Sequence, residues 1–144
     1  MTFLDAYALV ALAAEEPAAA DVETILREDE ARVVIVNLAE AVDIARRVHG
    51  FPGDDVRTML EHLLLGGAIG AAVSHERHAW LAAELRAKHY DRKTSALSMA
   101  DCLLLAHAVA NGGPIATSDP PVATVARAER IDVVALPDSS GVRP

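Results

Sequence analysis

Short runs of strand-forming residues alternate with longer helical segments from one end of the chain to the other. The clearest run is residues 33–36, Val-Val-Ile-Val, whose β-branched side chains are typical of a strand buried on both faces. Because strands that alternate with helices form parallel sheets, we predict an α/β fold with a central parallel β-sheet flanked by helices. The predicted strands are 2–5, 32–36, 68–73, 115–117 and 131–136, and the predicted helices are 6–14, 17–30, 38–48, 54–65, 75–89, 98–111 and 120–129.

The length and composition fit a single domain at residues 1–144, with a polar C-terminal tail at about 137–144. A chain of this length buries a core without needing disulfides or a structural metal. Hydrophobic residues make up 52% of the chain but aromatic residues only 3%, so the core must consist mainly of Ala, Leu and Val side chains. No internal repeat or linker divides the chain.

The net charge of −8 argues against binding to nucleic acid through bulk positive charge. RNA binding would require a local basic track or bound metal ions, whereas a basic protein partner would suit the acidic chain. The single thiol, Cys102, cannot form an internal disulfide and is expected to be a core residue in a reducing compartment. With no basic leader and no uncharged apolar run longer than residues 63–73, we expect a cytoplasmic protein that does not enter a membrane.

Four carboxylates occupy related positions in the predicted elements. Asp5 ends the first strand, and Glu40 lies in the first turn of the helix after the second strand. Asp101 lies in the first turn of the helix at 98–111, and Asp119 follows the fourth strand. In a parallel α/β fold, helix N-termini and strand C-termini lie at the same edge of the sheet, where such folds build their sites. The four acids are therefore expected to converge on one edge.

Each acid also has a purely structural explanation. Residues 37–40 (Asn-Leu-Ala-Glu) and 98–101 (Ser-Met-Ala-Asp) both resemble capping boxes. Asp119 before Pro120 resembles an N-cap followed by proline at the first helical position, and Asp5 alone would start a turn. Four carboxylates at one edge, however, repel each other unless a cation lies between them. Hard oxygen ligands suit Mg²⁺ or Mn²⁺, so the complete set favours a site for one or two divalent ions.

Four short segments resemble motifs of the PIN-domain family, and within it the VapC-type toxins of toxin–antitoxin pairs. They are residues 3–9 (Phe-Leu-Asp-Ala-Tyr-Ala-Leu), 37–40, 97–102 (Leu-Ser-Met-Ala-Asp-Cys) and 116–119 (Ala-Thr-Ser-Asp). The resemblance covers residues 3–136 and implies a three-layer PIN-like fold. It also implies a metal-dependent endoribonuclease that acts as the toxin of a toxin–antitoxin system, with Mg²⁺ or Mn²⁺ as cofactor, RNA as substrate, a homodimer and a cognate antitoxin protein.

The resemblance assigns a role to each acid. Asp5, Asp101 and Asp119 are candidate metal ligands and catalytic residues. Glu40 is a fourth catalytic candidate, which holds either the attacking water or a second metal ion. A metal ion at such a site makes hydroxide available near neutral pH for attack on an RNA phosphodiester.

One position departs from the family pattern. Many members carry Ser or Thr directly after the first Asp, where this chain has Ala6. This chain either lacks the hydroxyl contact that such a Ser or Thr makes, or supplies it from a candidate secondary residue, Thr117 or Ser118. Since the four acids themselves are present, we do not interpret the chain as an inactive member.

The most basic local stretch lies between the third predicted strand and Asp101. Its candidate contacts for RNA phosphates are Arg86, Lys88, Arg92 and Lys93. A solvated helix face explains the same charges equally well, so both interpretations stay open.

Two other functions remain alternatives. The first is an aspartate-nucleophile phosphohydrolase that uses Asp5, but such sites usually carry a second Asp two residues later, where this chain has Tyr7. The second is a PIN-like RNA-binding module that does not cleave RNA. The four intact acids argue against the second alternative, and a cleavage assay decides it.

Overall fold

The computed structural model describes all residues from 1 to 144 and contains one five-stranded parallel sheet. The strand order is β3-β2-β1-β4-β5, and every neighbouring pair is parallel. The predicted α/β fold with a parallel sheet is therefore confirmed. The strands are β1 (Thr2–Leu4), β2 (Ala31–Val34), β3 (Ile69–Ala72), β4 (Ile115–Thr117) and β5 (Val133–Ala135).

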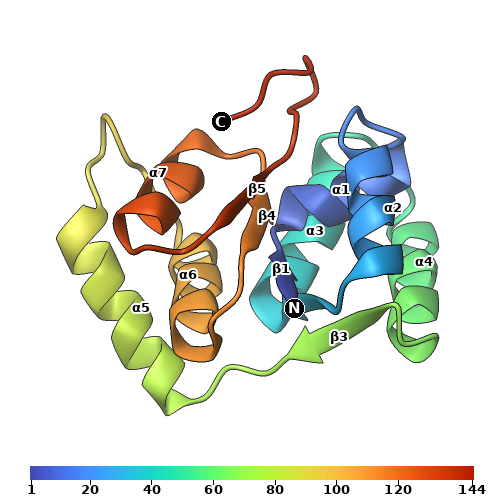
Figure 1. Cartoon of the computed structure of the whole chain (residues 1–144). Helices are drawn as coiled ribbons and strands as arrows, with labels where there is room; N and C mark the ends of the chain where they lie inside the picture. Colours follow the sequence, from blue (N-terminus) through green and yellow to red (C-terminus); the bar gives the residue numbers. More distant parts are fainter.

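Seven helices cover the two faces of the sheet (Figure 1). Helices α1 to α4 pack on one face, while α5, α6 and α7 pack on the other, which gives three layers. The helices are α1 (Ala6–Ala14), α2 (Ala19–Glu28), α3 (Ile35–Arg47), α4 (Gly53–Leu65), α5 (Glu76–His89), α6 (Met99–Asn111) and α7 (Pro120–Ala128). None of them is long and apolar enough to cross a membrane.

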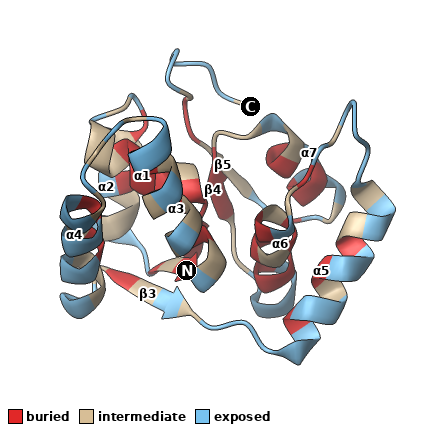
Figure 2. Ribbon diagram, turned by 180° about the vertical axis from the view of Figure 1, so that it is seen from behind, coloured by how far each residue is buried: buried red, intermediate tan, exposed pale blue.

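The pleat of the strands divides the core between the two faces. Phe3 packs among α5, α6 and α7, whereas the next residue, Leu4, packs among α1 to α4. Ile115 and Ala116 divide in the same way, because successive side chains of a strand point to opposite faces. Figure 2 shows the result, with buried residues concentrated in β4, α1, α6 and α7 and exposed residues on the outer sides of α4 and α5.

Helix α3 begins earlier than the sequence predicts. The β-branched run was expected to stay extended to residue 36, with Asn37 as the helix cap, but the strand ends at Val34 and Ile35 is already helical. Asn37, Ala41 and Ala45 lie one helical turn apart and are buried, so packing of this face outweighs the strand propensity of Ile35 and Val36. Consequently Asn37 lies inside the helix, and Glu40 lies in its second turn rather than its first.

The strand order reverses beside β1. From β1 the chain first builds β2 and β3 on one side and later β4 and β5 on the other. In open parallel sheets, ligands bind at this reversal, in the crevice outside the carboxyl ends of the strands. Asp5 directly follows β1 and Thr117 ends β4, so the reversal lies between these two residues.

Candidate metal centre

Asp5 is held in place by two hydrogen bonds from different segments of the chain. Its Oδ1 accepts a hydrogen bond from the backbone N–H of Ala6 at 2.6 Å, which makes Asp5 the N-cap of α1. Its Oδ2 accepts a hydrogen bond from Oγ1 of Thr117, also at 2.6 Å. Asp5 is only 6% exposed and Thr117 is fully buried. Of the two candidate secondary residues, Thr117 therefore supplies a hydroxyl contact to the first acid.

The environment of Asp5 disfavours its charged form. Burial, together with the negative charges of Asp101 and Asp119, raises the pKa of the Asp5 carboxyl to about 7, although the hydrogen bonds from Thr117 and Ala6 lower it. No lysine, arginine or histidine forms an ion pair with any of the four acids. A buried carboxylate without a cation is costly, so this position favours a bound positive charge.

Asp101 and Asp119 each cap a helix. They also lie, with Asp5 and Glu40, at one edge of the sheet, which we call the acidic edge. The Ser98 hydroxyl accepts a hydrogen bond from the N–H of Asp101 at 3.0 Å, and the N–H of Ser98 donates to Oδ2 of Asp101 at 2.6 Å. This is the predicted capping box of α6. Asp119 caps α7 through a longer contact, 3.4 Å from its Oδ1 to the N–H of Val122. Burial, with a contribution from Asp101, raises the pKa of Asp119.

Glu40 faces the same group of acids from α3. Burial is the largest cause of the raised pKa of the Glu40 carboxyl, and the charges of Asp101 and Asp119 add to it. Its Oε2 is buried and has no hydrogen-bond partner. The fold therefore brings the four predicted acids near enough to one another that Asp101 and Asp119 raise the pKa of both Asp5 and Glu40.

Asn37 was predicted only as a helix cap, and its position suggests a larger role. The side chain is completely buried, yet neither Oδ1 nor Nδ2 has a hydrogen-bond partner. Buried amides are nearly always paired, and leaving one unpaired costs about 1–3 kcal/mol. Asn37 lies one helical turn before Glu40, which also has an unpaired buried oxygen. The sequence signal was its spacing of three residues from Glu40, which was interpreted as a capping box.

The donor set fits a hard divalent cation, although the side chains are not arranged around one. No three Asp, Glu, His or Cys side chains lie close enough together to hold a metal ion. The four carboxylates, the unpaired Oε2 of Glu40 and the unpaired Oδ1 of Asn37 are nevertheless all oxygen donors of the kind that Mg²⁺ and Mn²⁺ prefer. The carboxylates must move closer together to share an ion.

The candidate RNA track divides into two pairs. Arg86 donates to the backbone oxygen of Leu97 and lies 4.3 Å from the ring centre of Tyr90, while Lys88 pairs with Glu129 at 2.7 Å. These two side chains are already engaged in holding α5 to its neighbours. Arg92 and Lys93 are exposed in the turn between α5 and α6 and form no ion pair.

Two smaller expectations concern neighbours of the acids. Cys102 is completely buried among the residues that pack on α6, as expected for a core residue. Burial raises the pKa of its thiol, which therefore stays protonated and unreactive at neutral pH. Ser118 is half-buried, whereas Thr117 makes the hydrogen bond to Asp5.

The sequence matches the family model of the PIN domain over residues 2–128. The chain belongs to the PIN-domain family. This match spans β1 to the end of α7 and contains all four acids. No curated protein sequence matches this PIN domain.

Three solved structures share this fold. VapBC2 from Rickettsia felis, bound to a DNA fragment from its promoter, has a TM-score of 0.65 at 15% identity over 92% of this chain and 96% of that one. FitAcB from Neisseria gonorrhoeae has a TM-score of 0.62 at 17% identity over 92% and 96%. A toxin–antitoxin complex from Klebsiella pneumoniae has a TM-score of 0.60 at 14% identity over 85% and 90%. These likenesses confirm the PIN-like fold.

Proposed function

We propose that this PIN domain is a Mg²⁺- or Mn²⁺-dependent endoribonuclease, with Asp5, Glu40, Asp101 and Asp119 as its catalytic residues. The observation that carries the proposal is the convergence of four carboxylates, from distant parts of the chain, at the reversal of the strand order without any basic partner. Such an arrangement is unfavourable until a cation neutralises it. A bound divalent ion supplies an activated water and offsets negative charge on the phosphate.

The protein's own residues have different roles at this site. Thr117 and the N–H of Ala6 orient the Asp5 carboxylate in the metal-free protein. The capping bonds hold Asp101 and Asp119 through the backbones of α6 and α7. Glu40 has one buried oxygen without a partner and would accept a hydrogen bond from the attacking water or would help to hold a second metal ion. The Asn37 amide, buried one turn earlier, orients Glu40 or this water.

The decisive experiment is a cleavage assay with purified protein and labelled RNA. We expect cleavage with Mn²⁺ or Mg²⁺ and none with a chelator. Asp101→Asn keeps a capping side chain at the same position and serves as the matched inactive variant. Binding of RNA without cleavage at any metal concentration would support the non-cleaving alternative instead.

We further propose that the nuclease is the toxin of a toxin–antitoxin pair. The support is the fold shared with members of such complexes and the negative charge of the acidic edge, which suits an antitoxin segment with Arg or Lys. Co-expression with the product of the neighbouring gene tests this proposal. If that product neither co-purifies nor relieves growth arrest, the toxin role fails, while the nuclease proposal is judged by the cleavage assay alone.

A homodimer is the remaining proposal about partners. Large apolar side chains lie exposed on α5, directly after it and at the start of α6: Trp80 is 65% exposed, Tyr90 44% and Met99 48%. Exposed apolar surface of this kind is commonly covered in a symmetric dimer. Light scattering at micromolar concentrations should give a dimer mass, and a monomer mass would refute the proposal.

A further inference from the structure

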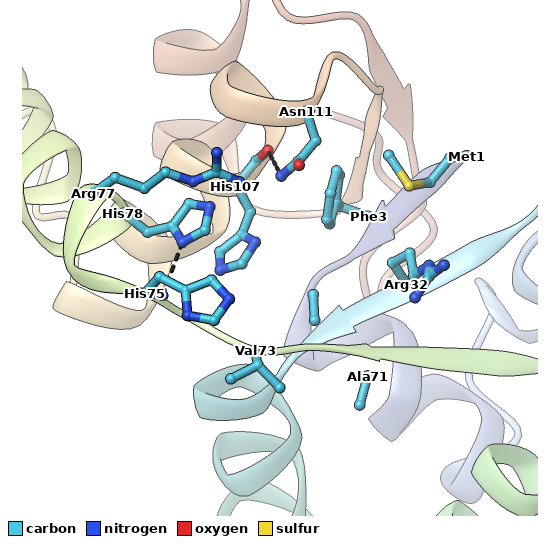
Figure 3. Close-up of a pocket in the computed structure, with 11 residues that line it drawn as sticks. Met1, Phe3, Arg32, Ala71, Val73, His75, Arg77, His78, His107 and Asn111 are labelled. Atoms are coloured by element: carbon cyan, nitrogen blue, oxygen red, sulfur yellow. Dashed lines mark hydrogen bonds between the residues drawn. The ribbon is translucent and has the colours of Figure 1, made fainter.

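A second candidate site lies at the edge of the sheet opposite the carboxylates. A cavity of about 310 Å³ opens between the first strands of the sheet and the facing ends of α5 and α6 (Figure 3). Phe3 of β1, His75 and Arg77 at the start of α5, and His107 near the end of α6 all line it. The carboxylates, by contrast, follow the carboxyl end of β1 and begin α6.

The lining of this cavity is rich in hydrogen-bond donors and free of carboxylates. Its eleven residues include two arginines and three histidines but no Asp or Glu. Arg32 pairs with Glu30 outside the cavity, whereas Arg77 is exposed and forms no ion pair. In a chain of net charge −8, Arg77 therefore provides an unpaired positive charge for an anion beside the cavity. His75 is also the N-cap of α5, so the positive end of that helix adds to it.

His78 supplies a buried donor that lacks a partner. Its Nδ1 accepts a hydrogen bond from the backbone N–H of His75 at 2.9 Å, so the neutral ring carries its proton on Nε2. This Nε2 has no partner, and the side chain is only 2% exposed. The ring is stacked on that of His107, with 3.9 Å between ring centres, and Figure 3 shows both rings among the side chains that line the cavity. An unpaired buried donor is unfavourable unless a ligand accepts its hydrogen bond.

The three histidines do not form a metal site. No three metal-binding side chains lie close enough together, and His107 Nε2 already contacts the hydroxyl of Ser74 at 3.0 Å. Burial, followed by the proximity of the His78 ring and of the Arg77 charge, lowers the pKa of His107 to about 4. Burial and the charge of Arg77 also lower the pKa of His78. Both rings are therefore neutral donors at neutral pH, and Arg77 provides the charge.

One end of α6 also borders the cavity and presents backbone carbonyl groups. Of these, the oxygen of His107 already accepts a hydrogen bond from Nδ2 of Asn111 at 2.8 Å (Figure 3). The remaining wall is apolar and is formed by Phe3, Val73 and the alanines of β3. The cavity thus combines donors on the side of α5 with an apolar surface on the side of the sheet.

We propose that this cavity binds a small phosphate monoester, such as a nucleoside monophosphate. A guanidinium group matches the geometry of phosphate oxygens, and the unpaired N–H of His78 adds a second donor. The volume falls at the lower end of the range of about 300–1,000 Å³ that is typical of small-molecule sites, which is more than a free phosphate ion needs. The apolar wall suits the organic part of the ligand.

Titration followed by NMR of the imidazole ring nitrogens tests this proposal. The protein is kept in chelator, without divalent metal, and is titrated separately with AMP, inorganic phosphate and adenosine. We expect AMP to shift the signals of His78 and His107, phosphate to shift them at higher concentration, and adenosine to bind at least about tenfold more weakly than AMP. If neither AMP nor phosphate shifts these signals at millimolar concentrations, the proposal is wrong. If adenosine binds as tightly as AMP, the phosphate assignment is wrong.

Three variants locate the site. Arg77→Gln removes the unpaired charge from an exposed position and should weaken AMP binding by about tenfold. Arg57→Gln, an exposed arginine on α4, is the matched control and should leave AMP binding unchanged. Asp101→Asn should also leave it unchanged, because the acidic edge is a separate site. Equal effects of Arg77→Gln and Arg57→Gln, or loss of binding in Asp101→Asn, would overturn the assignment to this cavity.

Discussion

The two edges of the sheet carry opposite chemistry within one small fold. At the carboxyl ends of β1 and β4, four acids lie near one another without a basic partner. At the other edge, arginine and histidine side chains meet without an acid. Helix α6 connects the two, since Asp101 in its first turn and Asn111 at its end are ten residues apart, about 15 Å along the helix axis.

The comparison of the two edges shows which kind of binding partner each edge lacks. In a folded protein, a buried carboxylate without a counter-charge is unfavourable, and so is a buried donor without an acceptor. We therefore expect a cation to bind at the acidic edge and an anion at the opposite edge. The overall charge of −8 conceals this division, because it sums over both edges.

The largest expected effect belongs to the acidic edge. Asp101→Asn should reduce RNA cleavage at least about a hundredfold, because charge stabilisation in the transition state is lost. The helix cap should persist, since Asn also accepts the hydrogen bond from Ser98. Initial rates on labelled RNA measure the effect, and circular dichroism checks the fold. Arg57→Gln is the control, and equal rates for Asp101→Asn and wild type would contradict the assignment.

The second effect is on stability without metal. The folded-state pKa of Asp5 is raised from 3.8 to about 7, so the folded protein binds more protons than the unfolded chain between these values. The resulting penalty is absent below about pH 4 and grows as the pH rises toward 7. Asp5→Asn should therefore be more stable than wild type at neutral pH, by on the order of 2–4 kcal/mol.

Urea denaturation in chelator at acidic and neutral pH measures the difference between Asp5→Asn and wild type. The difference should be greater at neutral pH than at about pH 4, because only there does wild type carry the penalty. A difference independent of pH would mean that the Asp5 carboxyl is not perturbed by its surroundings.

The third effect is stabilisation by metal. Mn²⁺ should stabilise the wild type by about 2–3 kcal/mol when free metal is about a hundred times its dissociation constant. The gain should be much smaller in Asp101→Asn, which lacks one ligand oxygen with its charge. Melting curves with and without Mn²⁺ measure both. An equal gain in the two proteins would make Asp101 a capping residue and not a ligand.

The fourth effect concerns Asn37. Asn37→Leu replaces an unpaired buried amide by an apolar side chain of similar size, so the metal-free protein should gain about 1 kcal/mol of stability. Cleavage should nevertheless fall by about tenfold, if the amide orients Glu40 or the attacking water. Thermal unfolding and initial rates are compared on the same preparation. Higher stability with unchanged cleavage would remove Asn37 from the site.

The smallest effect is expected for the basic turn before α6. Replacement of both Arg92 and Lys93 by Gln should raise the KM for RNA several-fold at low salt and leave kcat unchanged, because these exposed charges contact phosphates only electrostatically. The difference should disappear at high salt. An unchanged KM at low salt would leave this turn as a solvated surface.

Much of the fold follows from local patterns in the sequence. The alternation of strands and helices predicts a parallel sheet, and the caps at Ser98 and Asp119 begin α6 and α7 where expected. The helix at residues 6–14 has the predicted bounds. Parallel topology then implies that Asp5, Glu40, Asp101 and Asp119 share one edge, because strand ends and helix starts lie together there.

Only the tertiary structure decides features that depend on long-range packing. The β-branched residues Ile35 and Val36 are helical because the buried face of α3 requires it, and this places Asn37 inside the protein without a partner. The Thr117 hydroxyl reaches Asp5 across 112 positions of sequence, and His78 stacks on His107 from another helix. Sequence periodicity reports which face of an element is buried. It does not report which side chain from elsewhere in the chain meets that face, because this depends on how the layers pack.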